Sequence, residues 1–274
     1  MKKSTALLFG LAGAALLAGA GAALLLAPGK ADREQKKPFR GRNYAHRGLH
    51  SEDKSVPENS LEAFDKAASA GYGIELDVQL SRDGQVVVFH DDELKRVCGD
   101  PRRVDEVDWS ELKEMKLCGT EQTVPLFSTV LETVNGRSPL IVELKTGRRN
   151  DELCRKTCET LAGYNGNYCI ESFDPRIVAW FRKNAPEIIR GQLAAPASEY
   201  KNKKPLPFLL SHVLLNVIAR PHFIAYKIGR RPLSVRISEL MGAMKVGWTS
   251  TDPGSEKGRD AVIFEYYRPE VFYK

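Results

Sequence analysis

Charged side chains stand at alternate positions in two apolar stretches of the 274-residue sequence. Glu75 and Asp77 stand two apart in "GIELDVQLS", and Glu143 stands two residues before Lys145 in "LIVELK". Residues two apart in a strand point to the same face, and clustered carboxylate oxygens are the ligands that hard divalent cations prefer. The pattern therefore predicts a site for one divalent cation, Mg2+ or Ca2+, on Glu75, Asp77 and Glu143. The alternative is an ion-pair network in which Arg47 and Lys145 neutralise these carboxylates.

Two histidines stand at the ends of further apolar runs. His46 ends "NYAH" and is followed by Arg47, whereas His90 ends "VVVFH". Imidazole titrates near neutral pH, so two histidines beside three carboxylates can exchange a proton with a reacting oxygen. Arg47 and Lys145 add fixed positive charge that suits a phosphate. A cation, two histidines and two basic groups together indicate phosphoryl transfer.

Strand-like and helix-like segments alternate after residue 42, which is typical of parallel strands joined by crossover helices. The runs with strand character are 43–47, 73–81, 86–90, 140–145, 168–173, 191–193, 222–228, 245–250 and 260–266. Eight or nine strands in a chain of this length predict an α/β protein with a (β/α)8 TIM barrel and one extra strand.

Two of the connections have clear sequence signals. "SLEAFDKAASAG" predicts a crossover helix with Asn59 or Ser60 as N-cap and Gly71 as its stop. "SRDGQ", between the second and third runs, is too short for a helix, so these runs should form a hairpin.

The N-terminal region has a different composition from the rest. Residues 4–29 contain no charged side chain, and as a helix their apolar core would span roughly 33 Å, enough to cross a bilayer. The alternative is a cleaved signal segment, because Lys2 and Lys3 precede the run and "AGA" offers small residues for cleavage. The sequence thus predicts an anchor or signal over 1–29, a basic linker over 30–42 that acts as a flexible tether, and a barrel domain over 43–274.

These segments bear on localisation. We expect a protein anchored to the membrane by its single N-terminal helix, or a secreted protein if that segment is removed. The basic residues after the apolar run favour a cytoplasmic barrel, although Lys2 and Lys3 precede it, so the side of the membrane stays open.

Overall composition excludes several classes of partner. The net charge of +6 is concentrated partly in the basic linker and not in a basic face with interleaved aromatic residues, which disfavours nucleic acid binding. The five cysteines are an odd number without a CxxC pair, so a disulfide scaffold is not indicated. No protein partner is implied, and the expected partners are a small substrate and the membrane.

Several spaced motifs carry a resemblance to a known family. "AHRG", "PENSLEAF", "ELDVQLSRDGQVVVFHDDEL", "VDWSELKEM", "VPLFSTVLE" and "VELK" occur in that order. Together they resemble the glycerophosphodiester phosphodiesterase family, whose catalytic domain is a phospholipase-C-like TIM barrel. The match runs from about Tyr44 to Lys145 and continues more weakly through "ESFDPRIVAWFRKNAPEI" and "VGWTS".

The resemblance implies a role for each matching residue. His46 and His90 match the family's acid-base pair, and Glu75, Asp77 and Glu143 match its metal ligands. The implied substrate-binding residues are Arg47, Lys145, Glu58, Asn59 and Trp248. Residues 92–133 correspond to an insertion that helps to recognise glycerol.

The C-terminal third departs from the family pattern. This chain has "WTSTDP" and "IFEYYRP" where the family commonly has "WTVN" and "ITDRP", so its late acidic group is Glu265. "LPFLLSHVLLNVIARPHF" is also unusually apolar, and it reads either as an amphipathic barrel helix or as a surface that meets lipid.

The resemblance implies metal-dependent hydrolysis of glycerophosphodiesters to sn-glycerol 3-phosphate and an alcohol, an activity of lipid metabolism. One alternative keeps this centre but takes membrane lysophospholipids, in the manner of a lysophospholipase D. Another is a membrane-tethered barrel that binds phosphodiesters without turnover.

Overall fold

The computed structural model describes residues 21, 23–201 and 205–273. Within these residues no helix combines the length and the apolar character needed to cross a membrane. The predicted anchor or signal over 1–29 lies for the most part outside the described residues.

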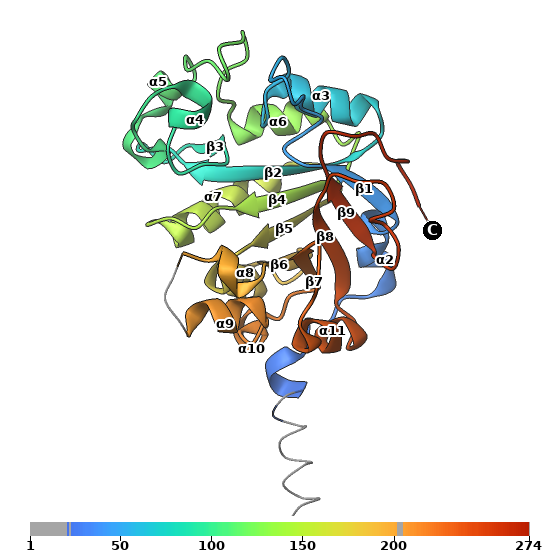
Figure 1. Cartoon of the computed structure of the whole chain (residues 1–274). Coiled ribbons are helices and arrows are strands. Elements are labelled where there is room, and N and C mark those ends of the chain that lie inside the picture. Colours follow the sequence, from blue (N-terminus) through green and yellow to red (C-terminus); the bar gives the residue numbers. More distant parts are fainter. Residues whose placement is uncertain (1–20, 22, 202–204, 274) are drawn as a thin grey trace, which may run out of the picture.

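The described residues form a closed barrel of eight parallel strands (Figure 1). The strands are β1 (Arg42–Ala45), β2 (Gly73–Leu80), β4 (Leu140–Leu144), β5 (Tyr168–Ser172), β6 (Arg190–Ala194), β7 (Phe223–Lys227), β8 (Met244–Ser250) and β9 (Ala261–Phe264). Each pairs with the next, and β1 closes the barrel by pairing with both β2 and β9. The predicted TIM barrel is confirmed.

The extra strand is β3 (Val86–Val88), which runs antiparallel to β2 with Val78 opposite Val88. The predicted hairpin is therefore confirmed, with its turn closed by a hydrogen bond from the Ser81 amide to the Gln85 carbonyl. The prediction of a strand that continues to residue 90 is wrong, because β3 ends at Val88 and His90 lies in the following loop.

Helices cover the outside of the barrel (Figure 1). They are α3 (Leu61–Ser69), α6 (Phe127–Val134), α7 (Asn150–Leu161), α8 (Pro175–Asn184), α9 (Leu206–Ser211), α10 (Asn216–Ala219) and α11 (Leu233–Leu240), with a short 3-10 helix η3 (Ala197–Glu199) before α9. α3 shows how the sequence sets these helices: the Ser60 hydroxyl caps it by accepting from the Ala63 amide, and Ala63, Phe64 and Ala67 bury one face. Of the two predicted N-caps, Ser60 is thus the one used.

A small subdomain lies between β3 and α6. It contains α4 (Lys95–Cys98), η2 (Val104–Glu106) and α5 (Trp109–Leu112). Its own apolar cluster includes Phe89, Leu94, Val104, Leu112 and Leu117, all of them buried. This cluster explains why the insertion is a compact unit that can hold the loop around His90 in place.

Residues 30–42 are not the flexible tether that their polar composition predicts. They contain α2 (Arg33–Lys36) and η1 (Lys37–Phe39), and Phe39 is buried in the core. The Lys36 ammonium donates to the Gly242 carbonyl at 3.0 Å, and Arg40 pairs with Asp260 at 2.6 Å. These contacts join distant parts of the sequence, which local composition cannot reveal.

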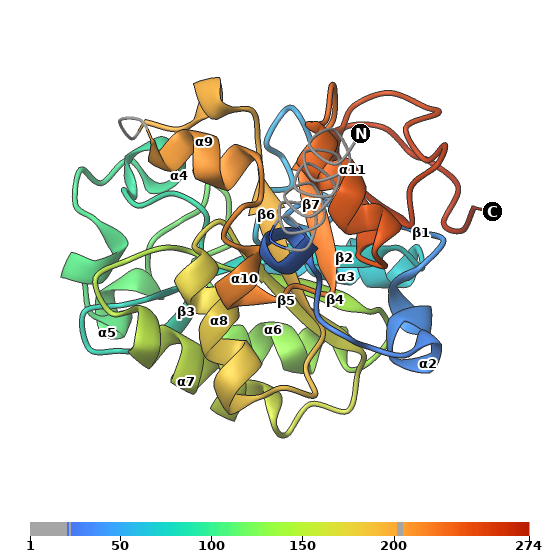
Figure 2. The same ribbon diagram turned by 90° about the horizontal axis from the view of Figure 1, so that it is seen from below.

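The helical residues 23–26 pack beside α10 and α11, as the view from below shows (Figure 2). Leu26 is buried in a cluster with Val213 and Val235. The Arg220 side chain donates to the carbonyls of Leu24 and Ala27 at 2.9 and 2.8 Å. The N-terminal segment thus leaves the barrel at a fixed place.

Candidate active site

Three buried carboxylates meet inside the barrel. Glu75 and Asp77 come from β2 and Glu143 from β4, and Asp77 stands directly opposite Glu143 in the strand register. One carboxylate oxygen from each lies within 4.8 Å of the others. The structure therefore brings together the three residues predicted as metal ligands.

Electrostatics of this cluster fit a bound cation. Burial, with the charges of Asp77 and Glu143, raises the pKa of Glu75 well above its usual range. Burial opposes ionisation of Asp77 as well, yet Lys145 and His90 hold its pKa well below the usual range. An all-oxygen set that is buried and mutually repulsive is suited to a hard divalent cation such as Mg2+ or Ca2+.

A fourth carboxylate extends the cluster. Glu171 on β5 stands opposite Glu143 and is buried, and its Oε2 has no hydrogen-bond partner within the described residues. Burial and the charge of Glu143 raise the pKa of Glu171 well above its usual range. The "YCIESF" run has the same acid-after-apolar signal as the other two strands, but the sequence analysis did not use it.

Two basic side chains border the carboxylates. The Lys145 ammonium lies 2.8 Å from Glu143 Oε1 and 3.3 Å from Asp77 Oδ1. The Arg47 amide donates to Glu75 Oε2 at 3.0 Å, and its guanidinium Nε lies 3.6 Å from Asp77 Oδ2. Burial works against both charges, but the neighbouring carboxylates raise the pKa of Lys145 and of Arg47. Both groups therefore stay cationic beside the cluster.

The loop after β1 holds these groups through Glu58 and Asn59. The Asn59 amide donates to the Arg47 carbonyl and its side chain donates to Asp77 Oδ2, both at 2.9 Å. Glu58 accepts from Arg47 and from Arg96, each at 2.7 Å. Burial would raise the pKa of Glu58, but the two arginines lower it to about 2. Both residues thus lie at the site, where they orient Arg47 and Asp77.

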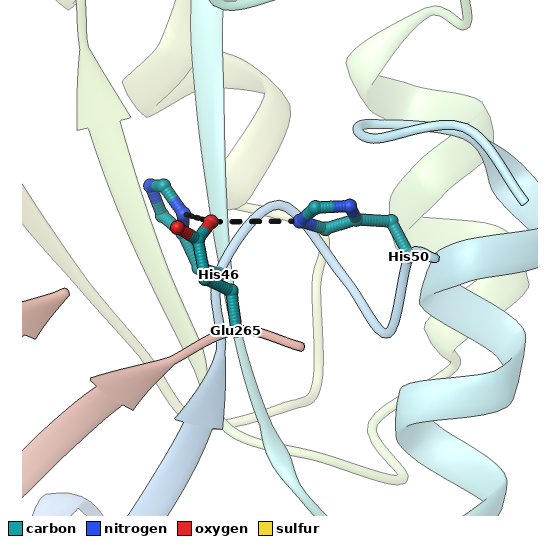
Figure 3. Close-up of side chains that lie close together, drawn as sticks. All are labelled: His46, His50 and Glu265. Atoms are coloured by element: carbon teal, nitrogen blue, oxygen red, sulfur yellow. Dashed lines mark hydrogen bonds and ion pairs between the residues drawn. The ribbon is translucent and has the colours of Figure 1, made fainter. Parts of the chain in front are cut away.

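His46 follows β1 and is held between two carboxylates. Its Nδ1 lies 2.8 Å from Glu265 Oε2, and its Nε2 lies 4.0 Å from Glu75 Oε2. Figure 3 shows Glu265 between His46 and His50, whose Nε2 lies 3.8 Å from the same oxygen. Burial lowers the pKa of His46, with Glu265 opposing the shift. The ring is therefore neutral near pH 7 and can accept a proton.

His90 is placed by the loop after β3. Its Nδ1 lies 2.6 Å from Asp91 Oδ1, and Arg96 donates to the other oxygen of Asp91 at 2.6 Å. The Gln79 side-chain amide donates to the carbonyls of Phe89 and Asp91, the residues on either side of His90, at 2.8 Å in both cases. The loop thus fixes His90 although no strand carries it.

Trp248 lies on β8 and lines a neighbouring cavity. Its indole nitrogen donates to the Ala225 carbonyl at 2.9 Å, and its ring packs edge-on against Phe173. The cavity that it lines measures about 790 Å³ and also includes Thr146, the residue after Lys145. Trp248 therefore borders a cavity whose lining reaches the residue after Lys145, but within the described residues no hydrogen bond joins it to the three carboxylates.

Sequence reasoning missed several supporting residues. Apart from Glu171, whose strand carries the signal described above, their positions in the sequence do not identify them, because each acts through a contact in an irregular loop or with a residue far away in the sequence. They are His50 near His46, Gln79, Asp91 and Arg96 around His90, and Glu171 beside Glu143. Glu265 was recognised as the late acidic group, but its contact with His46 was not predicted.

Comparison with known proteins identifies the family. A sequence model of the Glycerophosphoryl diester phosphodiesterase family matches residues 46–263. The chain is 32% identical over 195 residues to the uncharacterized protein YqiK of Bacillus subtilis, covering 62% of this chain and 79% of that protein. It is 33% identical over 157 residues to a glycerophosphodiester phosphodiesterase of Bacillus altitudinis, covering 53% of this chain and 63% of that enzyme.

The fold has matches among solved structures. One is an Oleispira antarctica phosphodiesterase in complex with the product sn-glycerol-3-phosphate, with a TM-score of 0.68 and 23% identity over 82% of this chain and 93% of that one. At this identity the likeness shows that the two proteins share the barrel fold. Because the family match extends over most of the sequence, from the first site histidine to the last barrel strand, the chain belongs to the glycerophosphoryl diester phosphodiesterase family.

Proposed function

We propose that the protein hydrolyses glycerophosphodiesters to sn-glycerol 3-phosphate and an alcohol, with the help of one divalent cation. The observation that carries the proposal is the close approach of Glu75, Asp77 and Glu143, within 4.8 Å, beside the half-buried basic side chains of Arg47 and Lys145. Family membership supports the same activity. A purely structural ion-pair network does not account for the surplus of buried carboxylates.

In this proposal Glu75, Asp77 and Glu143 would hold the divalent cation, which when bound would supply Lewis-acid chemistry at the phosphoryl group. Arg47 and Lys145 hold the phosphate oxygens, because both are cationic and both border the carboxylates. The carboxylates and the two basic side chains would thus contact one phosphodiester together.

In this proposal one histidine acts as the general base and the other as the general acid. His46 is neutral and its Nε2 faces the carboxylate cluster, so it accepts the proton of the attacking hydroxyl. His90 then donates a proton to the leaving oxygen, with Asp91 at its Nδ1 to stabilise the imidazolium. Their different surroundings support these roles, because the His46 side chain is 16% exposed and the His90 side chain is 31% exposed.

The experiment is a hydrolysis assay of the full-length protein with glycerophosphocholine, glycerophosphoethanolamine and glycerophosphoglycerol. We expect release of sn-glycerol 3-phosphate from at least one of them in Mg2+ or Ca2+, and none after chelation. Absence of product with every substrate and both cations would refute the proposal and favour a non-catalytic barrel.

We also propose that the protein is attached to a membrane. The support is the uncharged run over 4–29 and the exposed apolar side chains that residues 23–26, α9, α10 and the α11 region carry. These side chains are Leu24, Leu25, Leu206, Phe208, Ile218, Leu233, Leu240 and Met241. Vesicle flotation tests the idea: the full-length protein should float with the vesicles, and a chain that begins at Ala23 should float less.

A further inference from the structure

His46, His50 and Glu265 form a second cluster of metal-ligating side chains, beside the three buried carboxylates (Figure 3). Glu265 Oε2 lies 2.8 Å from His46 Nδ1 and 3.8 Å from His50 Nε2. One ligand atom from each of the three residues lies within 4.8 Å of the others. A carboxylate thus stands between two imidazole nitrogens.

A tight turn after β1 brings the two histidines together. They stand four residues apart in "HRGLH", and the Gly48 amide donates to the Ala45 carbonyl at 3.2 Å. Gly48 has a φ of +80°, and a Cβ at this position would lie 2.8 Å from Ala63 of α3. Glycine alone accepts both this conformation and this close approach. The loop can therefore turn against α3 and direct His50 toward Glu265.

His50 is the member of the cluster that the proposed proton transfers do not use. It is 7% exposed, and its Nε2 has no hydrogen-bond partner among the described residues. Figure 3 shows this nitrogen directed at Glu265, at a distance too long for a hydrogen bond. A buried polar atom without a partner is unfavourable, and a metal ion that accepts the nitrogen lone pair would remove that penalty. The burial and direction of His50 Nε2 thus suit a metal ligand.

The ligand set favours a different cation from the one proposed for the three carboxylates. Two imidazoles and one carboxylate suit a borderline transition metal such as Zn2+, whereas an all-oxygen set suits Mg2+ or Ca2+. Burial works against ionisation of Glu265, yet the adjacent rings of His46 and His50 hold its pKa well below the usual range. The cluster therefore offers zinc two neutral nitrogens and one negative oxygen.

The spacing fits a tetrahedral ion after small side-chain rotations. Two ligands at zinc-ligand distances of about 2.0 Å lie roughly 3.3 Å apart in tetrahedral geometry, and the observed separations of 2.8 and 3.8 Å lie on either side of that value. The Glu265 side chain is 20% exposed and the neighbouring Tyr266 is 50% exposed. Solvent thus reaches the edge of the cluster, which gives an ion a way in.

A metal on this cluster would change the tautomer of His46. The hydrogen bond to Glu265 places the ring proton on Nδ1 and leaves Nε2, 4.0 Å from Glu75 Oε2, able to accept a proton. A metal bound to Nδ1 takes the lone pair of that nitrogen, so the single proton of the neutral ring is then on Nε2. In this form the ring cannot act as a general base.

We propose that His46, His50 and Glu265 form a second metal site, which takes a borderline transition metal such as Zn2+ and thereby inhibits hydrolysis. The inhibition rests on the proposed function, because it requires His46 to be the general base. Binding of the metal does not rest on it. The two clusters then sort cations by ligand type: a hard cation on the carboxylates supports turnover, and zinc on the imidazoles opposes it.

Isothermal titration of the full-length protein with Zn2+, in excess Mg2+ or Ca2+, tests the site itself. We expect one strongly bound zinc per chain. His50→Phe keeps a ring against Tyr266, and His50→Gln keeps a polar side chain, but both remove the imidazole ligand and should weaken zinc binding at least about tenfold. His212→Phe, at a histidine after α9 outside both clusters, is the matched control and should leave the affinity unchanged. Wild-type affinity in both His50 variants would overturn the proposal.

A carboxylate variant shows which cluster holds the zinc. Glu143→Gln removes a charge from the carboxylate cluster and should leave the affinity for the strongly bound zinc unchanged. Loss of that zinc in Glu143→Gln, with binding retained in the His50 variants, would place the metal on the carboxylates and rule out the second site.

Inhibition is measured on glycerophosphocholine hydrolysis at increasing Mg2+ or Ca2+. Saturating zinc should lower kcat at least about tenfold, as for loss of a general base, and the zinc concentration for half inhibition should not rise with the hard cation. His50→Phe, compared with itself without zinc, should need at least about tenfold more zinc for half inhibition. Relief of inhibition by Mg2+ or Ca2+ would contradict the proposal, since zinc would then compete for the carboxylates. If no diester is hydrolysed, the proposed function fails, whereas the zinc titrations still decide the site.

Discussion

Glu265 Oε2 lies 2.8 Å from Nδ1 of His46, and the Nε2 of the same ring lies 4.0 Å from Glu75 Oε2. The hydrogen bond to a carboxylate places the ring proton on Nδ1, which leaves Nε2 free to accept a proton on the side of the acidic cluster. His46 and Glu265 come from opposite ends of the barrel sequence, since His46 follows β1 and Glu265 follows β9. One contact thus sets both the orientation and the tautomer of His46.

Replacing either partner should lower turnover. We expect His46→Ala to lower kcat by about 10²-fold or more, as for loss of a general base, and Glu265→Leu to lower it about tenfold by releasing the ring. Steady-state kinetics with glycerophosphocholine measures both, with KM expected to change less than kcat. Glu270→Gln, at an exposed acid five residues away, is the control. Near-normal kcat in Glu265→Leu would show that the hydrogen bond does not position His46.

The acid role of His90 can be tested through the leaving group. His90→Ala should lower kcat by about 10²-fold with glycerophosphocholine, because the choline oxygen leaves only when protonated. A diester with a p-nitrophenol leaving group needs no such protonation, so much of the loss should disappear. His46→Ala serves as the comparison, since its defect should persist with both substrates. If the activated leaving group rescued His46→Ala and not His90→Ala, His46 would be the general acid and His90 the general base.

Cation binding should be visible in stability as well as in activity. A ligand that binds only the folded state raises the free energy of unfolding, by about 2.7 kcal/mol at one hundred times Kd, and therefore raises the melting temperature. We therefore expect Mg2+ or Ca2+ to raise the Tm of chelator-treated protein, and Glu143→Gln to weaken this effect. Differential scanning calorimetry provides the measurement, with Glu132→Gln, on α6 and outside the cluster, as the control. Full activity in excess chelator would contradict the prediction.

A buried histidine outside the site should make stability depend on pH. Burial lowers the pKa of His222 to about 3, and the charges of Arg190 and Lys36 act in the same direction. In the unfolded chain this pKa is about 6.5, so between these values the unfolded state binds a proton that the folded state excludes. The contribution of His222 to stability is thus fully present above pH 6.5 and is lost as the pH falls toward 3.

Urea unfolding at pH 7 and pH 5 measures this loss. His222→Gln keeps an acceptor for the Arg190 amide, which donates to the His222 ring at 3.3 Å, but cannot be protonated. Its unfolding midpoint should fall less between the two pH values than that of the wild type. Equal decreases in the two proteins would show that His222 does not control the pH dependence.

Local pattern was sufficient for much of the site. Glu75, Asp77 and Glu143 could be predicted because alternation in a strand fixes the face of a side chain, and parallel strands set their register side by side. The eight parallel strands and the hairpin followed from the same periodicity and from turn residues. Such features depend only on residues close together in the sequence.

The remaining features depend on contacts that sequence spacing does not encode. His90 was expected on a strand, but pairing of β3 with β2 ends at Val88, and Gln79 holds the loop beyond it. The segment 30–42 was expected to be a tether, yet Lys36 and Phe39 pack against the barrel. In each case the partner lies elsewhere in the chain, so tertiary packing overrides local composition.

Closure of the barrel by β1 and β9 also governs when the protein can first become active. During synthesis β1 appears early and β9 is the last barrel strand to be made, and contacts so distant in sequence form slowly. Until β9 pairs with β1, His46 lacks Glu265, whereas the carboxylates of β2 and β4 can already lie together. A nascent barrel could therefore hold a cation before His46 is oriented for turnover.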